Sequence, residues 1–143
     1  MGEFDHIHAK AYFNLLLTGS WIEGRIKQAL KPFGLTHAQL NVLYLLNEND
    51  PFPVSASDIK GRILVSNPDV TRLLDRLVNK NIINRETCQD NRRKIDVSLT
   101  ESGKALFNEA HKAAKEAVHD FLREKISDSE AKELRRILHK IRA

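Results

Sequence analysis

The chain has 143 residues, of which 41% are hydrophobic and 29% are charged, and its formal net charge at pH 7 is +4. This composition excludes a disordered chain, and no apolar run approaches the length of a transmembrane helix. The single cysteine, Cys88, excludes an internal disulfide. We therefore expect one folded domain over residues 1–143, in a reducing cytoplasmic setting and without membrane contact.

Positive charge is concentrated in the middle of the chain. Residues 60–104 carry 10 basic and 6 acidic side chains, whereas residues 1–59 carry 4 basic and 6 acidic side chains. A local basic excess suits a polyanion such as nucleic acid, and it equally suits a solvated surface of mixed charge. Charge alone leaves both interpretations open.

Two helices are predicted before this basic segment. Apolar residues at four-residue spacing predict a helix over residues 5–30. This helix is expected to end at residues 31–34, which contain a proline and a glycine. Thr36 and Gln39 have the spacing of a capping box, which predicts a second helix reaching about Glu48. The side chains that we expect to face inward from this helix are Leu40, Leu43, Tyr44 and Leu46.

A short third helix and an amphipathic fourth helix follow. Ser55 or Ser57 can cap the third helix. Ser66 is the expected cap of the fourth helix, and Asp69 favours its positive end. The fourth helix has an apolar face of Val70, Leu73, Leu74, Leu77 and Val78, and a polar face of Asn67, Thr71, Arg72, Asp75, Arg76, Asn79 and Lys80.

A hairpin and two more helices complete the chain. Residues 94–99 alternate with period two and predict a strand, for which residues 82–87 supply a partner. The loop between them is a basic tip with Arg92 and Arg93. Helices are then expected over residues 101–125 and from Ser127 onward. The first of these would be about 37 Å long at 1.5 Å per residue, so its apolar face needs a partner beyond a compact lobe.

This order of elements predicts a mainly α fold with a small β-hairpin wing, a winged helix-turn-helix. A helix about 10–12 Å across fits the major groove of B-DNA, which is about 12 Å wide. The polar face of the fourth helix offers side chains that hydrogen-bond base edges and phosphates. The alternative is that this face is only a solvated helical surface.

Three stretches in this order resemble the MarR family of transcription regulators. They lie within residues 35–43, 70–78 and 92–103, and the flanking helices extend the likeness over the chain. The resemblance implies a homodimer, with dimerisation helices at about 5–30 and 101–143. It also implies a lobe at about 36–100 that binds double-stranded DNA at an inverted repeat.

The resemblance implies DNA contacts from the fourth helix and from the wing. Arg93 matches the residue that enters the minor groove, and Arg92 would touch phosphate. Arg76 either contacts DNA or pairs with an acidic neighbour. One departure is Asn91, which stands where the family often has aspartate. The candidate DNA-binding residues are Asn67, Pro68, Thr71, Arg72, Arg76, Arg92 and Arg93.

A small organic effector is also implied, bound between the dimer helices and the DNA-binding lobe. Cys88 is expected to be an incidental wing residue rather than a thiol sensor, since the family's peroxide sensors carry their cysteine in the first helix. His37 and His111 could meet, but no metal or cofactor is expected. Candidate effector-lining residues, which could equally be plain core, are Phe13, Leu17, Trp21, His37, Tyr44 and Phe107.

The sequence thus predicts a homodimeric DNA-binding regulator, acting as a repressor that a small molecule releases by population shift. No nucleophile–base–acid set, phosphate-binding loop or metal motif is present in the sequence, so no enzyme is expected. The alternative function is a winged-helix module for protein–protein assembly without sequence-specific DNA binding.

Overall fold

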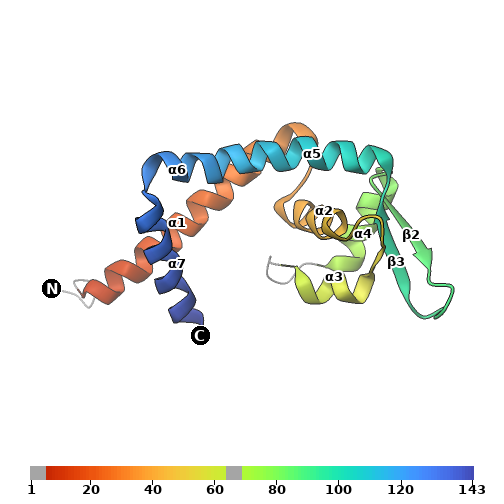
Figure 1. Ribbon diagram of the computed structural model, residues 1–143, viewed down its shortest axis with the longest axis horizontal. Helices are drawn as coiled ribbons and strands as arrows, with labels where there is room; N and C mark the ends of the chain where they lie inside the picture. Colours follow the sequence, from red (N-terminus) through yellow and green to blue (C-terminus); the bar gives the residue numbers. More distant parts are fainter. Residues whose placement is uncertain (1–5, 64–68) are drawn as a thin grey trace.

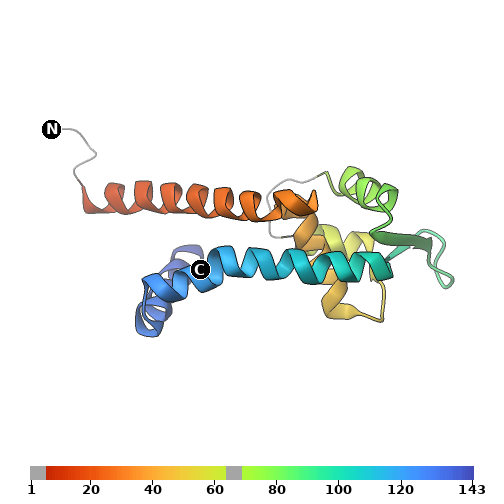
Figure 2. The same cartoon turned by 90° about the horizontal axis from the view of Figure 1, so that it is seen from above.

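The computed structural model describes residues 6–63 and 69–143. Helices dominate, and a lobe that holds α2, α3, α4 and a small sheet lies at one end (Figure 1). Two long helices, α1 and α5, run from this lobe toward the far end, where α6 and α7 lie (Figures 1 and 2). In the described part of the chain, every helix is too short or too polar to cross a membrane.

The first two helices follow the sequence prediction. Helix α1 spans Ile7–Leu30, and a short 3-10 turn, η2 (Lys31–Phe33), ends it at Gly34, whose φ of 64° suits glycine. Helix α2 spans His37–Asn49 and begins with a capping box. The backbone N–H of Gln39 donates to Oγ1 of Thr36 (3.1 Å), and the N–H of Thr36 donates to Oε1 of Gln39 (3.0 Å).

The buried surface of α2 is wider than the expected stripe. Leu40, Leu43 and Leu46 are buried as predicted, but Tyr44 is 43% exposed, so its inward placement was wrong. The buried surface of α2 is wide because this helix contacts α1, α5 and the sheet. Additional side chains buried by these neighbours are Gln39, Val42 and Leu45.

A third strand, which the sequence did not predict, precedes α3. Strand β1 comprises only Val54 and Ser55, a length at which no alternation can be recognised. It pairs antiparallel with β3, placing Val54 opposite Val97, and the sheet order is β1-β3-β2. Helix α3 spans Ala56–Arg62 and has the predicted cap, because Oγ of Ser55 accepts the N–H of Asp58 (3.2 Å).

Helix α4 spans Val70–Asn79 and begins later than expected. Its cap is Asp69, whose Oδ1 accepts the backbone N–H of Arg72 at 3.1 Å. Ser66 was therefore the wrong cap, because a carboxylate three residues before Arg72 satisfies the first turn directly. The predicted DNA-contact residues Asn67 and Pro68 lie, like Ser66, outside the described residues. The apolar face is buried as predicted through Val70, Leu73, Leu74 and Leu77.

The predicted hairpin is present as β2 (Ile83–Thr87) and β3 (Ile95–Leu99). The two strands pair antiparallel, from Ile83 opposite Leu99 to Thr87 opposite Ile95. Side chains of both strands enter the core beside α4 and α5. The hairpin is therefore anchored at its base, while its tip projects away from the lobe (Figure 1).

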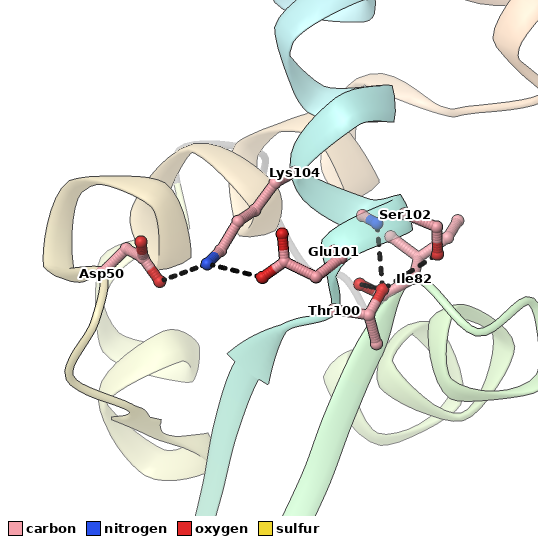
Figure 3. A network of polar contacts seen from close by, with 7 residues as sticks. Asp50, Ile82, Thr100, Glu101, Ser102 and Lys104 are labelled. Atoms are coloured by element: carbon pink, nitrogen blue, oxygen red, sulfur yellow. Dashed lines mark hydrogen bonds and ion pairs between the residues drawn. The ribbon is translucent and has the colours of Figure 1, made fainter.

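A polar joint fixes the start of α5 (Glu101–Lys115) against the turn between α4 and β2 (Figure 3). Oγ1 of Thr100 accepts the N–H of Gly103 (2.9 Å) and bonds to the carbonyl of Asn81 (2.7 Å). Oγ of Ser102 donates to the same carbonyl (2.9 Å). Gly103 lies so close to Ile82 that an added Cβ would overlap the Ile82 carbonyl oxygen.

An ion-pair bridge lies beside this joint and ties α5 to the end of α2. Nζ of Lys104 lies 3.4 Å from Oδ1 of Asp50 and 3.2 Å from Oε1 of Glu101 (Figure 3). These two carboxylates raise the pKa of the Lys104 ammonium. The joint and the bridge together make the first turn of α5 part of the lobe.

The long C-terminal helix contains a π-helical turn that the sequence did not predict. Helix α5 continues through η3 (Glu116–Asp120) into α6 (Phe121–Lys125). Nε of Arg25 donates to the carbonyl of Ala117 at 2.7 Å, and the Arg25 guanidinium lies 4.1 Å from the centre of the Phe121 ring. A π turn leaves local backbone groups without their regular partners, and Arg25 supplies one from α1.

Helix α7 spans Asp128–Arg142 and opens with the predicted capping box. The N–H of Glu130 donates to Oγ of Ser127 (3.1 Å), and the N–H of Ser127 donates to Oε1 of Glu130 (3.0 Å). This second bond favours the ionised carboxylate and lowers the pKa of Glu130. None of the α7 side chains is buried.

Candidate nucleic-acid interface

The polar face of α4 stands out from the lobe. Thr71, Arg72 and Arg76 are exposed on it, whereas the opposite face is packed in the core. Among the described residues, neither Arg72 nor Arg76 forms an ion pair. Of the two readings that the sequence left for Arg76, pairing with an acidic neighbour is therefore not seen in this structure.

A groove between α3, α4 and the wing brings the two predicted contact elements together. It has a volume of about 490 Å³, and Thr71 of α4 and Arg93 of the wing both line it. Arg72, Arg76 and Arg92 lie outside its lining. The other lining residues are Ala56, Ser57, Lys60, Val70, Leu74, Asn91, Lys94 and Ile95.

Two polar residues of this groove were missed from the sequence. Ser57 and Lys60 lie on α3 and are exposed. The available signal was the pair of basic residues, Lys60 and Arg62, in the last turn of α3. Sequence reasoning gave weight only to the fourth helix and the wing tip, although the preceding helix of such a motif crosses the nucleic-acid backbone.

The wing tip is held by Asn91. Its Oδ1 accepts the N–H of Arg93 (3.1 Å), and its carbonyl accepts the N–H of Lys94 (2.9 Å). A further bond from the N–H of Cys88 to the carbonyl of Lys94 (2.8 Å) closes the base of the loop. The amide oxygen of Asn91 thus serves as an acceptor for the wing backbone, and the Arg92 and Arg93 side chains remain exposed.

The one acidic residue within α4 is paired across to the wing. Oδ1 of Asp75 accepts a hydrogen bond from Nη1 of Arg85, which lies on β2. Both side chains are partly exposed. This pair was not predictable from local sequence, because ten residues and a change of secondary structure separate its members.

The six predicted effector residues do not lie together within one chain. Tyr44 and Phe107 lie together with His111, whose ring centre is 5.6 Å from that of Tyr44 and 5.2 Å from that of Phe107. A hydrogen bond to the Glu48 carboxylate raises the pKa of the Tyr44 hydroxyl. These contacts form an aromatic cluster on the side of α2 that faces α5.

The remaining effector candidates belong to α1 or contact it. Nδ1 of His37 lies 2.9 Å from the Glu23 carboxylate, away from the His111 cluster. Trp21 packs on Phe121, with ring centres 5.2 Å apart. Phe13 and Leu17 are exposed on α1. The effector site therefore stays a prediction.

Within the described residues, no further side chains support the metal hypothesis or the redox hypothesis. Across residues 6–63 and 69–143, no three His, Cys, Asp or Glu side chains are grouped so that they could hold a metal ion. Cys88 is half-buried at the base of the wing tip. It is the only cysteine of the chain, so no internal partner exists for it.

Comparison with known proteins gives a consistent result. The model of the MarR family matches residues 35–95. The HTH-type transcriptional repressor MdtR of Bacillus subtilis (strain 168) is 38% identical over 88 residues, which cover 62% of this chain. The match spans 56% of the length of MdtR, or just over half of that protein.

Solved structures match along almost the whole chain. The YusO protein of Bacillus subtilis is 28% identical, with a TM-score of 0.66, and the match covers 98% of this chain and 97% of YusO. A mutant MarR of Escherichia coli, solved in complex with operator DNA, is 23% identical with a TM-score of 0.81. That match covers 99% of both chains and shows a shared fold.

Proposed function

Because the chain belongs to the MarR family, we propose that it is a transcription regulator that binds double-stranded DNA as a homodimer. The observation that carries this proposal is the groove in which Thr71 of α4 and Arg93 of the wing lie together. Relatives such as MdtR are transcription regulators, which favours this function over a protein–protein assembly module.

Helix α4 would enter the major groove, and the wing would follow the neighbouring backbone and minor groove. Thr71, Arg72 and Arg76 are exposed for contacts from α4, and Arg92 and Arg93 are exposed for contacts from the wing. Asn67 and Pro68 complete the proposed set at the start of the recognition segment. Lys60 and Lys94 add positive charge at the edge of the groove, where phosphates would lie.

Exposed apolar side chains on α1 and α7 support the homodimer. Ile7, Leu17 and Ile141 are each more than 60% exposed, and further large apolar residues lie on both helices. Monomeric proteins rarely expose apolar patches of this extent. In the proposal, residues about 5–30 and 101–143 dimerise, residues about 36–100 bind an inverted-repeat operator, and residues 1–143 act as one unit.

The regulator would act as a repressor released by a small organic effector. The aromatic cluster of Tyr44, Phe107 and His111 supports an effector site between α2 and α5. A hollow of about 560 Å³ beside Trp21 and Arg25 supports a second position between α1 and η3. The proposal places the protein in the cytoplasm, where such DNA is found, and assigns it no catalytic reaction.

The test is duplex binding as a function of salt, using DNA from upstream of the protein's own gene. Contacts to about 6–10 phosphates predict a loss of roughly 10³–10⁵ in affinity between 50 and 200 mM salt. Arg72→Ala should weaken binding to the operator, as located by footprinting, far more than binding to random duplex. The reason is that a bidentate base contact discriminates by about 1–3 kcal/mol. Arg93→Ala should weaken both, most strongly at A·T-rich flanks.

The matched control is Lys132→Ala, which removes one positive charge from an exposed position on α7, far from the groove. It should leave both affinities unchanged. Wild-type affinity in Arg72→Ala and Arg93→Ala, or a flat response to salt, would refute DNA binding through this groove.

A further inference from the structure

A carboxylate sits in the middle of the surface that would face DNA. Asp75 is one helical turn from both Thr71 and Arg72, and Arg76 is its neighbour in sequence. Its side chain is 48% exposed, so burial does not neutralise it. A carboxylate in this position would repel phosphates, and it would compete with DNA for the Arg72 guanidinium.

The structure pairs this carboxylate with an arginine from the wing instead. Arg85 lies opposite Val97 in the β2–β3 ladder, so the two side chains share one face of the sheet. Val97 is fully buried, which means that this face is the one turned toward the helices of the lobe. From that face Nη1 of Arg85 reaches Oδ1 of Asp75.

The pairing has two consequences for the interface. It cancels the one negative charge within α4, and neither Arg72 nor Arg76 forms an ion pair within the described residues. It also ties the strand that leads to Arg92 and Arg93 directly to the recognition helix. An ion pair this exposed contributes little to folding stability, so stability does not account for its presence.

We propose that Arg85 is a positioning residue of the DNA interface, which neutralises Asp75 without contacting DNA itself. This inference rests on the proposed DNA-binding function. It differs from a direct contact in a testable way, because the need for Arg85 disappears when Asp75 is no longer charged.

The experiment is a double-mutant cycle on operator affinity at fixed salt, with Arg85→Gln, Asp75→Asn and the double variant. Arg85→Gln leaves an unpaired carboxylate facing DNA and should lose about tenfold in affinity, within the range of coupled neighbours. Asp75→Asn should bind at least as tightly as wild type. The double variant should return to within about threefold of wild type.

A second readout separates positioning from contact. The slope of log affinity against log salt should be the same in the double variant as in wild type. A direct phosphate contact by Arg85 would lower that slope by about 0.9 in both Arg85 variants. All three variants should keep the wild-type Tm within a few degrees, which confirms that folding is not what changes.

The remaining outcomes overturn the inference. A double variant as weak as Arg85→Gln means that Arg85 contacts DNA, and wild-type affinity in Arg85→Gln means that the pair has no role. Weak binding by Asp75→Asn means that Asp75 itself reads the DNA, for example by accepting from cytosine. Failure of the proposed function is distinct from all of these, since wild type would then bind no duplex in a salt-dependent way.

Discussion

The lobe buries its large apolar residues, whereas the two helices α1 and α7, here called the arms, expose most of theirs. In the lobe, buried side chains from α2, α3, α4, the sheet and the first half of α5 form one core. In the arms, α1 buries only Leu30, at its lobe end, and α7 buries no residue. Large apolar side chains exposed on the arms are Ile7, Tyr12, Phe13, Leu15, Leu16, Leu17, Trp21, Leu134, Ile137 and Ile141.

This difference shows which contacts determine the structure of each region. The lobe is specified by contacts within one chain, so substitutions there act on folding. The arms expose apolar surface that burial would stabilise, by about 25 cal/mol per Å², only through another molecule. Substitutions in the arms should therefore act on assembly and depend on protein concentration.

The largest effect is expected in the lobe, at the joint between α5 and the α4–β2 turn. Gly103→Ala places a Cβ where it overlaps the carbonyl oxygen of Ile82. The backbone at both residues cannot move freely. We expect a loss of about 3 kcal/mol in the free energy of unfolding, at the upper end of overpacking effects. Urea denaturation at several protein concentrations measures it.

Gly61→Ala is the matched control, because an added Cβ there has open space on an exposed part of α3. It should be neutral or stabilising by up to about 1 kcal/mol, since alanine favours helix more than glycine does. Equal stability of the two variants would mean that the joint is not tightly fixed.

A second, smaller effect separates the arms from the lobe. Ile137→Glu puts a charge on the exposed apolar side of α7, and in a dimer that charge would be desolvated. We expect sedimentation at micromolar concentration to change from about twice the 16.3 kDa chain mass to the monomer. The far-ultraviolet circular dichroism should stay as in wild type, because the helices remain folded.

Lys132→Glu provides the control, with a larger change in charge at an exposed residue on the opposite side of α7. It should remain dimeric. A dimeric Ile137→Glu variant would show that this side of α7 is not part of the interface.

The smallest effect concerns pH and the start of α7. The pKa of Glu130 is lowered from 4.5 by the hydrogen bond from the Ser127 backbone. A lowered folded-state pKa contributes stability above the unfolded value, and that contribution is lost as pH falls through the folded value. The protection factors of α7 amides, which correct hydrogen exchange for the intrinsic rate at each pH, should therefore fall below about pH 4.5.

Glu130→Gln keeps an acceptor oxygen but does not titrate, so its α7 amides should show less of this acid-induced change. The difference between the two profiles isolates Glu130 from the other carboxylates that titrate over the same range. Superimposable profiles would show that the capping carboxylate does not stabilise α7.

The sequence predicted those features whose causes are local. The capping boxes at Thr36 and Ser127 depend on side chains three residues apart, and both are present. The presence of the hairpin follows from the alternation in residues 94–99. The exposed face of α4 and the basic wing tip follow in the same way from periodicity and composition.

Features that depend on distant partners were not predictable. The exposure of Tyr44 is decided by where α5 and the sheet lie against α2. The two-residue strand β1 exists only because β3 offers an edge to pair with. At the candidate interface, Lys60 joins the groove through the packing of α3, and Arg85 reaches Asp75 only in the folded lobe.

The π-helical turn in the long C-terminal helix has a consequence for the arms. Each residue of an α-helix advances the chain by about 100° around the axis, so a π turn changes the direction of every later side chain. Phe121 follows this turn and meets Trp21 of α1. A regular α-helical turn over the same residues, Glu116–Asp120, would keep the composition but rotate Phe121 away from α1. The angular setting of the distal arm thus depends on the π-helical form of η3.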